Sequence, residues 1–309
     1  MDLVSGAFKE PSLFNPSAAS LPPHILKEHQ LQQSSSLMTG MFALYQIIGA
    51  VIGGFMYELL PISLIFIING SSFILSGLSE MFINVSTKPD NMIKIHFKQI
   101  VLDIKEGVSY IFTLKPIFYL VAIASILNFF TIPLIINGVP YLFVVVLEQE
   151  AYYMSVLNAM FPIGIIITSI ILGSSIQKDK VSPLIIKGML FMGIFVTVFV
   201  YLTHIVYYNH EQFMLFMWIG SFSLLFAGIF NGMINIPFNV AIQKTVEKNK
   251  LGRVSSVIGI ISNGLTPIAI GLGGVVIQYM GVLALFYIAP IAMIGTAFMA
   301  RKNKYVNQL

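Results

Sequence analysis

The stretch "GMFALYQIIGAVIGG", residues Gly40–Gly54, holds four glycines among 15 otherwise mostly apolar residues. Glycine destabilises the interior of a helix by roughly 0.5–1 kcal/mol relative to alanine. A soluble helix would rarely contain four of them. Inside a membrane, however, small residues allow two helix backbones to approach each other closely. The stretch therefore predicts a transmembrane helix with a smooth face for a neighbouring helix.

The overall composition agrees with a membrane location. The chain has 309 residues, of which 57% are hydrophobic and only 10% are charged, whereas a soluble domain carries about 25% charged residues. We therefore expect an all-α integral membrane protein. The absence of cysteine excludes a disulfide framework and a thiolate metal site. The five histidines show no ligand spacing, so neither a metal nor a cofactor is expected.

Eight apolar runs are long enough to cross a bilayer, which takes about 20 residues as a helix. They lie at 37–58, 62–83, 116–137, 154–176, 184–206, 214–237, 254–277 and 282–300. The last two come from one uncharged run, Val254–Ala300, in which "QYMG" at 278–281 is the expected turn.

Positive charge is confined to alternate connections between these runs. Lysine and arginine lie before the first run (Lys27), between the second and third, fourth and fifth, and sixth and seventh runs, and after the last, and only Lys9 is left over. Because positive charge marks the cytoplasmic side, we expect a multi-pass protein of the cell membrane with a cytoplasmic C-terminus. The net charge of +4 then reflects topology, and no nucleic-acid partner is expected.

The longest connection, 87–115, carries apolar residues at helical spacing with lysines between them. The apolar set comprises Phe97, Ile100, Val101, Ile104, Val108, Ile111 and Phe112. This pattern predicts an amphipathic helix that lies on the inner membrane face.

Residues 15–40 and 235–260 share a common plan at an offset of 220. The offset aligns Leu31 with Leu251, Ser35 with Ser255, and Gly53 with Gly273. Internal repeats of this kind build many secondary transporters. Three spans and most of a fourth precede the second copy, whereas only residues 1–14 precede the first. We therefore expect a chain that begins inside a fourth helix. The missing N-terminal helices, on another chain, are a candidate partner.

If the first copy were complete, the molecule would contain six spans, a long basic central loop and six further spans. This arrangement resembles the major facilitator superfamily. The quoted stretch is similar to the fifth-helix signature of its drug/proton antiporters, which matches at Gly40, Gly49, Gly53 and Gly54, with Ala50 in place of the usual proline. "FNPSAASLP" (14–22), "GRVSS" (252–256, with Arg253 in a cytoplasmic loop) and "NGLTPIAIGLGG" (263–274) resemble its macrolide and siderophore exporters.

The resemblance implies four segments. These are a truncated N-terminal bundle (1–86, the end of the fourth helix with the fifth and sixth), a cytoplasmic amphipathic central loop (87–115), a C-terminal six-helix bundle (116–300) and a cytoplasmic tail (301–309).

In the family, substrate binds in a central cavity lined by the first, fourth, seventh and tenth helices. The resemblance therefore implies cavity-lining roles for Asn128 and Thr131 on the seventh helix and for Asn231 and Asn235 on the tenth. A buried polar stripe in lipid is unfavourable unless it faces water, a ligand or another helix. Hydrogen bonding between helices is thus an open alternative for the same residues.

A proton antiporter needs a titratable group, and the six C-terminal spans contain no acidic residue. Glu10 is the candidate if residues 1–20 form the fourth helix, because an intramembrane charge is a functional hypothesis by default. The alternative is that a truncated helix exposes Glu10 to water. The expected energy source is the proton gradient, with no cofactor.

These observations lead to two functional hypotheses. The first is an exporter, present as an incomplete chain, that carries out proton-coupled efflux of an amphipathic small molecule of drug, macrolide or siderophore type by alternating access across a bacterial inner membrane. The second is a non-transporting membrane remnant or scaffold from a truncated gene. The chain contains no HExxH, GxSxG, P-loop or GxGxxG motif, so an enzyme is not expected.

Overall fold

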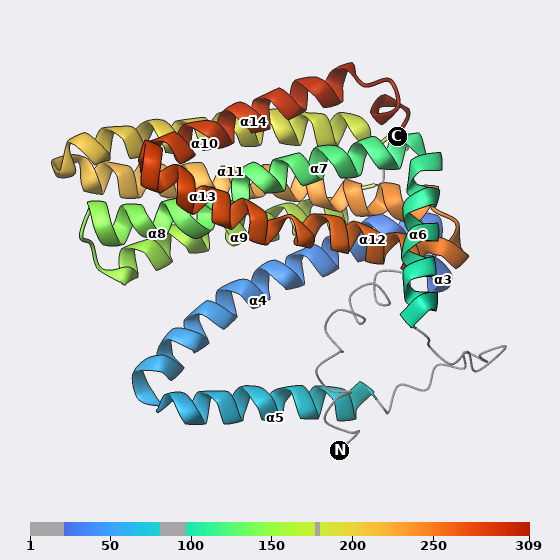
Figure 1. Ribbon diagram of the computed structural model, residues 1–309, viewed down its shortest axis with the longest axis horizontal. Helices are drawn as coiled ribbons and strands as arrows, with labels where there is room; N and C mark the ends of the chain where they lie inside the picture. The colour runs from blue at the N-terminus through green and yellow to red at the C-terminus, as the bar shows by residue number, and fades with distance from the viewer. Residues whose placement is uncertain (1–21, 81–96, 177–179) are drawn as a thin grey trace.

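The computed structural model describes residues 22–80, 97–176 and 180–309 (Figure 1). Within these ranges the chain is helical and contains no β-strand. In the described part of the chain, seven helices are long and apolar enough to cross a membrane. They coincide with seven of the eight expected spans, and the first span coincides with the 29-residue helix α4. The prediction of an all-α membrane protein is confirmed.

Long helices make up most of the described chain. In chain order they are α4 (Leu31–Leu59), α5 (Ile62–Glu80), α6 (Phe97–Thr113), α7 (Lys115–Pro133), α9 (Ala151–Ser174), α10 (Ser182–Tyr208), α11 (Phe213–Thr245), α12 (Leu251–Gly264), α13 (Thr266–Met280) and α14 (Val282–Lys302). The described residues also form two short α-helices, α3 (Pro22–Ile25) and α8 (Val139–Tyr141). The expected turn at 278–281 is confirmed, because α13 ends at Met280 and Gly281 has φ +84°.

Two spans differ in detail from the sequence-based bounds. The third continues to Val146 through π-helical turns at Leu134–Gly138 and Leu142–Val146, which accommodate Pro133 and Pro140 without ending the helix. The seventh is divided at Leu265, where α13 begins with Pro267 in its first turn. Proline lacks the backbone N–H that a continuous helix would need at this point.

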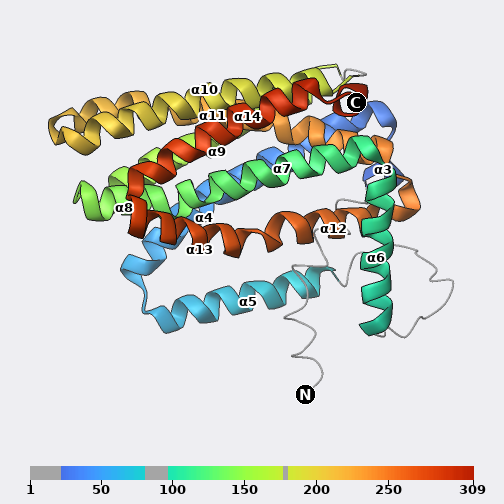
Figure 2. The ribbon, with the colours of Figure 1, turned by 45° about the horizontal axis from the view of Figure 1, so that its top comes forward.

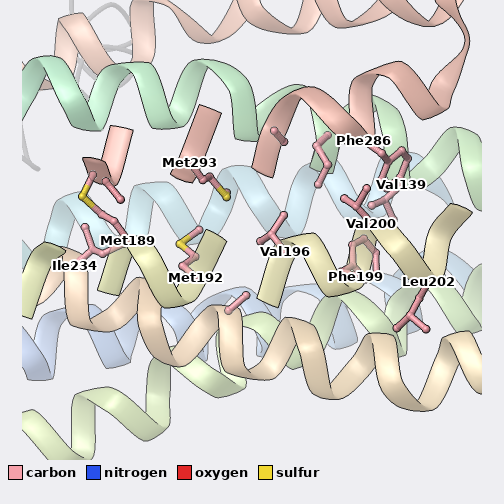
Figure 3. Packing of buried hydrophobic residues seen from close by; sticks show 14 of the residues in the cluster. Val139, Met189, Met192, Val196, Phe199, Val200, Leu202, Ile234, Phe286 and Met293 are labelled. Atoms are coloured by element: carbon pink, nitrogen blue, oxygen red, sulfur yellow. The ribbon is translucent and has the colours of Figure 1, made fainter. Parts of the chain in front are cut away.

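Helices α7, α9, α10, α11 and α14 form the bundle that contains most of the core. Its largest fully buried side chains include Phe143, Phe199, Phe216 and Phe286. Figure 3 shows how methionines and aliphatic residues fill the space between α10, α11 and α14. Burial of such apolar surface is the main favourable contribution to the packing.

Glycine makes the contact between α9 and α11 unusually close. A Cβ atom on Gly228 would collide with the carbonyl oxygen of Phe161, and one on Gly164 with that of Leu225. One turn further along, Thr168 donates a hydrogen bond of 2.7 Å to the carbonyl of Ile229. The two backbones therefore touch directly, as small residues permit in membrane bundles.

Helix α6 runs crosswise to the long helices at one end of the bundle, beside the C-terminus (Figures 1 and 2). We call this end the α6 end. The helix predicted in the central connection is thus present, with the crosswise orientation expected for a helix along a membrane surface. Part of its apolar face, including Gly107 and Ile111, packs against α12 and α7 instead of facing lipid.

Helices α4 and α5 extend away from the bundle. Figure 1 shows α4 in contact with the bundle near the α6 end and then slanting away from it. The exposure of the α4 side chains follows the same course. Near the start of the helix, Leu31, Ser35, Ser36 and Ala43 are buried, whereas most large apolar residues from Leu44 onwards are exposed. The membrane-length part of α5 is not buried at all within the described chain.

The internal repeat is visible in the helix boundaries. A 3₁₀ turn at Glu28–Gln30 precedes α4, and one at Lys248–Lys250 precedes α12, at the offset of 220. The starts of α5 and α14, at Ile62 and Val282, keep this offset. The copies differ in one respect, since the first copy has one continuous helix, α4, where the second has α12 and α13. Pro267 lies at the start of α13, and the corresponding residue inside α4 is Ile47.

Candidate functional site

The predicted polar residues of α11 form a ladder along one side of that helix. Asn235 is exposed, and its Nδ2 donates to Oδ1 of Asn231 at 2.8 Å and to the Asn231 carbonyl at 3.1 Å. Asn231 is half-buried and lies 3.9 Å, from Nδ2, to the sulfur of Met192 on α10. Asn235 thus has no hydrogen bond to another helix in the described part of the chain.

The predicted residues of α7 have different surroundings. Asn128 is exposed and makes no hydrogen bond within the described residues. Thr131 is half-buried and donates to the carbonyl of Leu127 at 2.7 Å, within its own helix. The amide of Asn128 is therefore available to a ligand, whereas the Thr131 hydroxyl already has an acceptor.

The polar residues of α7 and α11 lie at a similar depth. Val121 of α7 and Ile242 of α11 belong to the same buried cluster near the α6 end. Asn128 follows Val121 by seven residues, and Asn235 precedes Ile242 by seven, so both lie roughly 10 Å beyond this cluster at 1.5 Å per residue. Among the described residues, no hydrogen bond joins the two asparagines.

Asn137, a third polar residue of this span, connects two helices. Its Nδ2 donates to the carbonyl of Ile270 on α13 at 3.3 Å. The adjacent Gly273 approaches Pro133 so closely that a Cβ atom would lie 2.6 Å from the proline Cβ. Asn137 therefore takes the alternative role, helix-to-helix hydrogen bonding.

A second close contact is the seam between α4 and α9, which we define by Gln32, Ser36, Gly40, Ser169 and Gly173. Gln32 is buried and its Nε2 donates to the carbonyl of Leu172 at 2.7 Å and to Oγ of Ser175 at 3.1 Å. A Cβ atom on Gly40 would lie 2.9 Å from Cβ of Ser169, and one on Gly173 would lie 3.4 Å from Cβ of Ser36. The seam joins a helix of the N-terminal segment (1–86) to a helix of the C-terminal segment (116–300).

An ion pair adds to the seam at the α6 end. Nζ of Lys244, in the last turn of α11, lies 3.1 Å from Oε1 of Glu28, just before α4. The glutamate is largely exposed, so this pair contributes little to stability. With the Gln32 hydrogen bonds and the Gly40 contact, this pair is the third connection between the N-terminal and C-terminal segments at the α6 end.

The glycines of the quoted stretch differ in their surroundings. Gly40 meets α9 closely, whereas Gly49 has nothing within 4 Å of an added Cβ, because α4 has left the bundle at that point. Gly53 and Gly54 lie in α4, but their surroundings are outside the described part of the structure. The expected smooth face is therefore in contact at its first glycine and open at Gly49.

Valine at position 40 should loosen the seam, whereas valine at position 49 should not. The Gly40→Val side chain would displace Ser169, and overpacking of this kind costs about 1–3 kcal/mol. The measurement is protease cleavage of α4 in detergent-solubilised protein, with Gly49→Val as the matched control. Equal cleavage of both variants would show that Gly40 has no packing role.

Of the two remaining predicted residues, Arg253 can be placed. Arg253 lies in the first turn of α12, and its Nη1 donates to Oε2 of Glu106 on α6 at 3.0 Å. It therefore helps to hold α6 against the bundle. Glu10 lies outside the described residues.

Sequence reasoning missed Gln32 and the Gly164–Gly228 contact. Gly228 and Gly232 are spaced as in the GxxxG pattern of close helix pairs, so this signal was present. No sequence signal identifies Leu172 and Ser175 as partners of Gln32, because that pairing depends on which helices become neighbours. The described residues contain no group of three histidine, aspartate or glutamate side chains placed to hold a metal.

Comparison with known families gives one match. The family model described as Major Facilitator Superfamily matches residues 3–271, which is most of the chain. Neither a search of curated proteins nor a search of solved structures finds a match. The family match spans the seam between α4 and α9 and the polar residues of α7 and α11.

Proposed function

The chain belongs to the major facilitator superfamily and is a multi-pass membrane transporter, and from this premise we propose that it exports an amphipathic small molecule in exchange for protons. The proposed substrate is of drug, macrolide or siderophore type. Export would proceed by alternating access, in which two repeats rock about a site near the bilayer midplane.

The shape of the seam between α4 and α9 is the observation that carries this proposal. The N-terminal and C-terminal segments are connected at the α6 end by Gln32, Gly40 and the Lys244–Glu28 pair. Away from that end, α4 slants away from the bundle (Figure 1). A seam closed at one end and open at the other is the geometry that one state of an alternating-access cycle requires.

The exposed amides support a substrate site for this cycle. Asn128 and Asn235 project from apolar helices at similar depth, beyond the closed end of the seam. An amide offers both donors and an acceptor, which suits a ligand with mixed polar and apolar character. The ladder through Asn231 orients Asn235 from within its own helix.

The proposed orientation places the α6 end in the cytoplasm of a bacterial cell, at the inner membrane. Lys115, Lys187, Lys244 and Arg301 lie toward the ends of their helices that point to this side. The opposite connections carry Glu148, Glu150 and Glu211 without lysine or arginine. This asymmetry follows the positive-inside rule.

Proton coupling is proposed to depend on Glu10, since the six C-terminal spans contain no carboxylate. In cells that express the chain, we expect lower accumulation of a cationic dye than in control cells. A protonophore should abolish this difference, because it removes the energy source. Dye export that persists in the presence of the protonophore would contradict proton coupling.

A second candidate function is a non-transporting scaffold or remnant, and one observation favours it. The membrane-length part of α5 is unburied within the described chain, which leaves an apolar surface for helices of another chain. Under this candidate, the inserted protein would not change dye accumulation at all. Co-expression with a chain that supplies further helices would likewise leave dye accumulation unchanged.

A further inference from the structure

We propose that the C-terminal tail, Asn303–Leu309, is a strap that pins the first turns of α7 to α10 and α14 and that can be released while the helix bundle stays folded. The tail lies at the α6 end, where the C-terminus is drawn in Figures 1 and 2. This conformational role goes beyond the proposed export function and does not depend on it.

Asn303 reverses the chain where α14 ends at Lys302. Its Oδ1 accepts hydrogen bonds from the backbone N–H groups of Tyr305 at 2.9 Å and of Val306 at 3.3 Å. Asparagine favours turns because its short side chain can bond to the backbone two residues further on. A single 3₁₀ turn, Val306–Gln308, follows. The sequence thus builds a folded tail after the last span.

Tyr305 attaches this tail to the first turns of α7. Its half-buried ring stacks on that of Tyr119, with the centroids 5.4 Å apart and an angle of 5° between the planes. Nζ of Lys115, the first residue of α7, lies 5.3 Å from the centre of the Tyr305 ring, which is within cation–π range. The tail therefore contacts two successive turns of α7.

Val306 and Leu309 attach the tail to the rest of the bundle. Val306 is fully buried in the main hydrophobic cluster, which also contains Val181 before α10 and Ala300 of α14. The backbone N–H of Val181 donates to the carbonyl oxygen of Leu309 at 2.8 Å. The half-buried Leu309 packs against both this cluster and the smaller cluster of α6, α7, α11 and α12. The tail thus bridges the two clusters.

The bridge is small enough to open by itself. In the described chain it consists of a stacked ring, a buried valine, a half-buried leucine and a backbone hydrogen bond. The close α9–α11 contact at Gly164 and Gly228 lies outside it. Segments with few buried contacts open at lower free energy than the whole fold. Release should loosen the first turns of α7 without separating the clusters, because Phe238 of α11 also packs against both.

The first test measures how fast a thiol beneath the strap reacts with a maleimide in the purified full chain. The chain has no native cysteine, and Val181 is only 7% exposed. We expect Val181→Cys with Val306→Asp to react at least roughly tenfold faster than Val181→Cys alone, because the opened strap uncovers this position. Gln308→Asp is the matched control, since Gln308 is exposed in the same turn, and it should keep the slow rate.

The second test follows amide hydrogen exchange by mass spectrometry in the same proteins without the added cysteine. Val306→Asp should speed exchange in the first turns of α7 and leave exchange at the α9–α11 contact unchanged. Tyr305→Ala should have the same effect on α7, and it removes only a half-buried ring, so folding is preserved.

Three results would overturn the proposal. An unchanged maleimide rate in the Val306→Asp protein would show that the tail does not cover Val181. Unchanged exchange of α7 in both variants would show that the tail does not hold this helix. Faster exchange in α9 and α11 as well would show that the tail is part of the global fold and is not a releasable strap.

Discussion

Gly228→Ala is expected to destabilise the helix bundle by about 3 kcal/mol, at the upper end of the usual overpacking cost. The added Cβ atom would overlap the carbonyl oxygen of Phe161. A backbone atom cannot rotate away as the end of a flexible side chain can. Helices α9 and α11 would therefore have to separate, and their other contacts would weaken.

The measurement is thermal unfolding of the purified protein in detergent, together with the folded fraction by size exclusion. Gly164→Ala should behave in the same way, because its Cβ atom would meet the carbonyl oxygen of Leu225. Gly259→Ala and Gly271→Ala are the matched controls, since nothing lies within 4 Å of either added Cβ. If the Gly228 and Gly164 variants unfolded at the same temperatures as the two control variants, the close α9–α11 contact would be refuted.

Asn235→Leu is expected to reduce dye export by at least roughly tenfold, which corresponds to about 1.4 kcal/mol of lost binding. The stability of the protein should change little, because Asn235 is exposed and bonds only within its own helix. Loss of transport with intact folding is what a substrate contact predicts. Loss of both together would favour a structural role.

Asn239→Leu provides the control for this experiment. Asn239 is also exposed and lies one helical turn nearer the α6 end of α11. The same change in polarity there should leave the export rate nearly unchanged. Export rates are compared at equal amounts of membrane-inserted protein, and full export by Asn235→Leu would remove this residue from the proposed site.

The elements of this fold that depend on local patterns were predictable. Apolar length located the spans, Gly281 ended the seventh of them, and the spacing of Phe97 to Phe112 predicted α6. The repeat was also detectable, because helix starts such as Leu31 and Leu251 depend on nearby residues in both copies.

The remaining features depend on which helices become neighbours. Asn137 and Asn128 look alike in the sequence, but only Asn137 meets a carbonyl of another helix, that of Ile270. Gly40 and Gly49 belong to the same signature, yet only Gly40 contacts α9. The distinction arises from the direction in which α4 leaves the bundle, and no local pattern specifies it.

Alternating access requires the seam between α4 and α9 to open during transport, and a reversible cross-link across the seam would prevent that opening. The chain has no native cysteine. Cysteines introduced by Ser36→Cys and Gly173→Cys would place their Cβ atoms about 3.4 Å apart, close to the disulfide range of roughly 3.5–4.5 Å. We predict that oxidation forms this disulfide and stops dye export, and that reduction restores it, while either single variant is unaffected by oxidant. Undiminished export by the fully cross-linked protein would contradict the account.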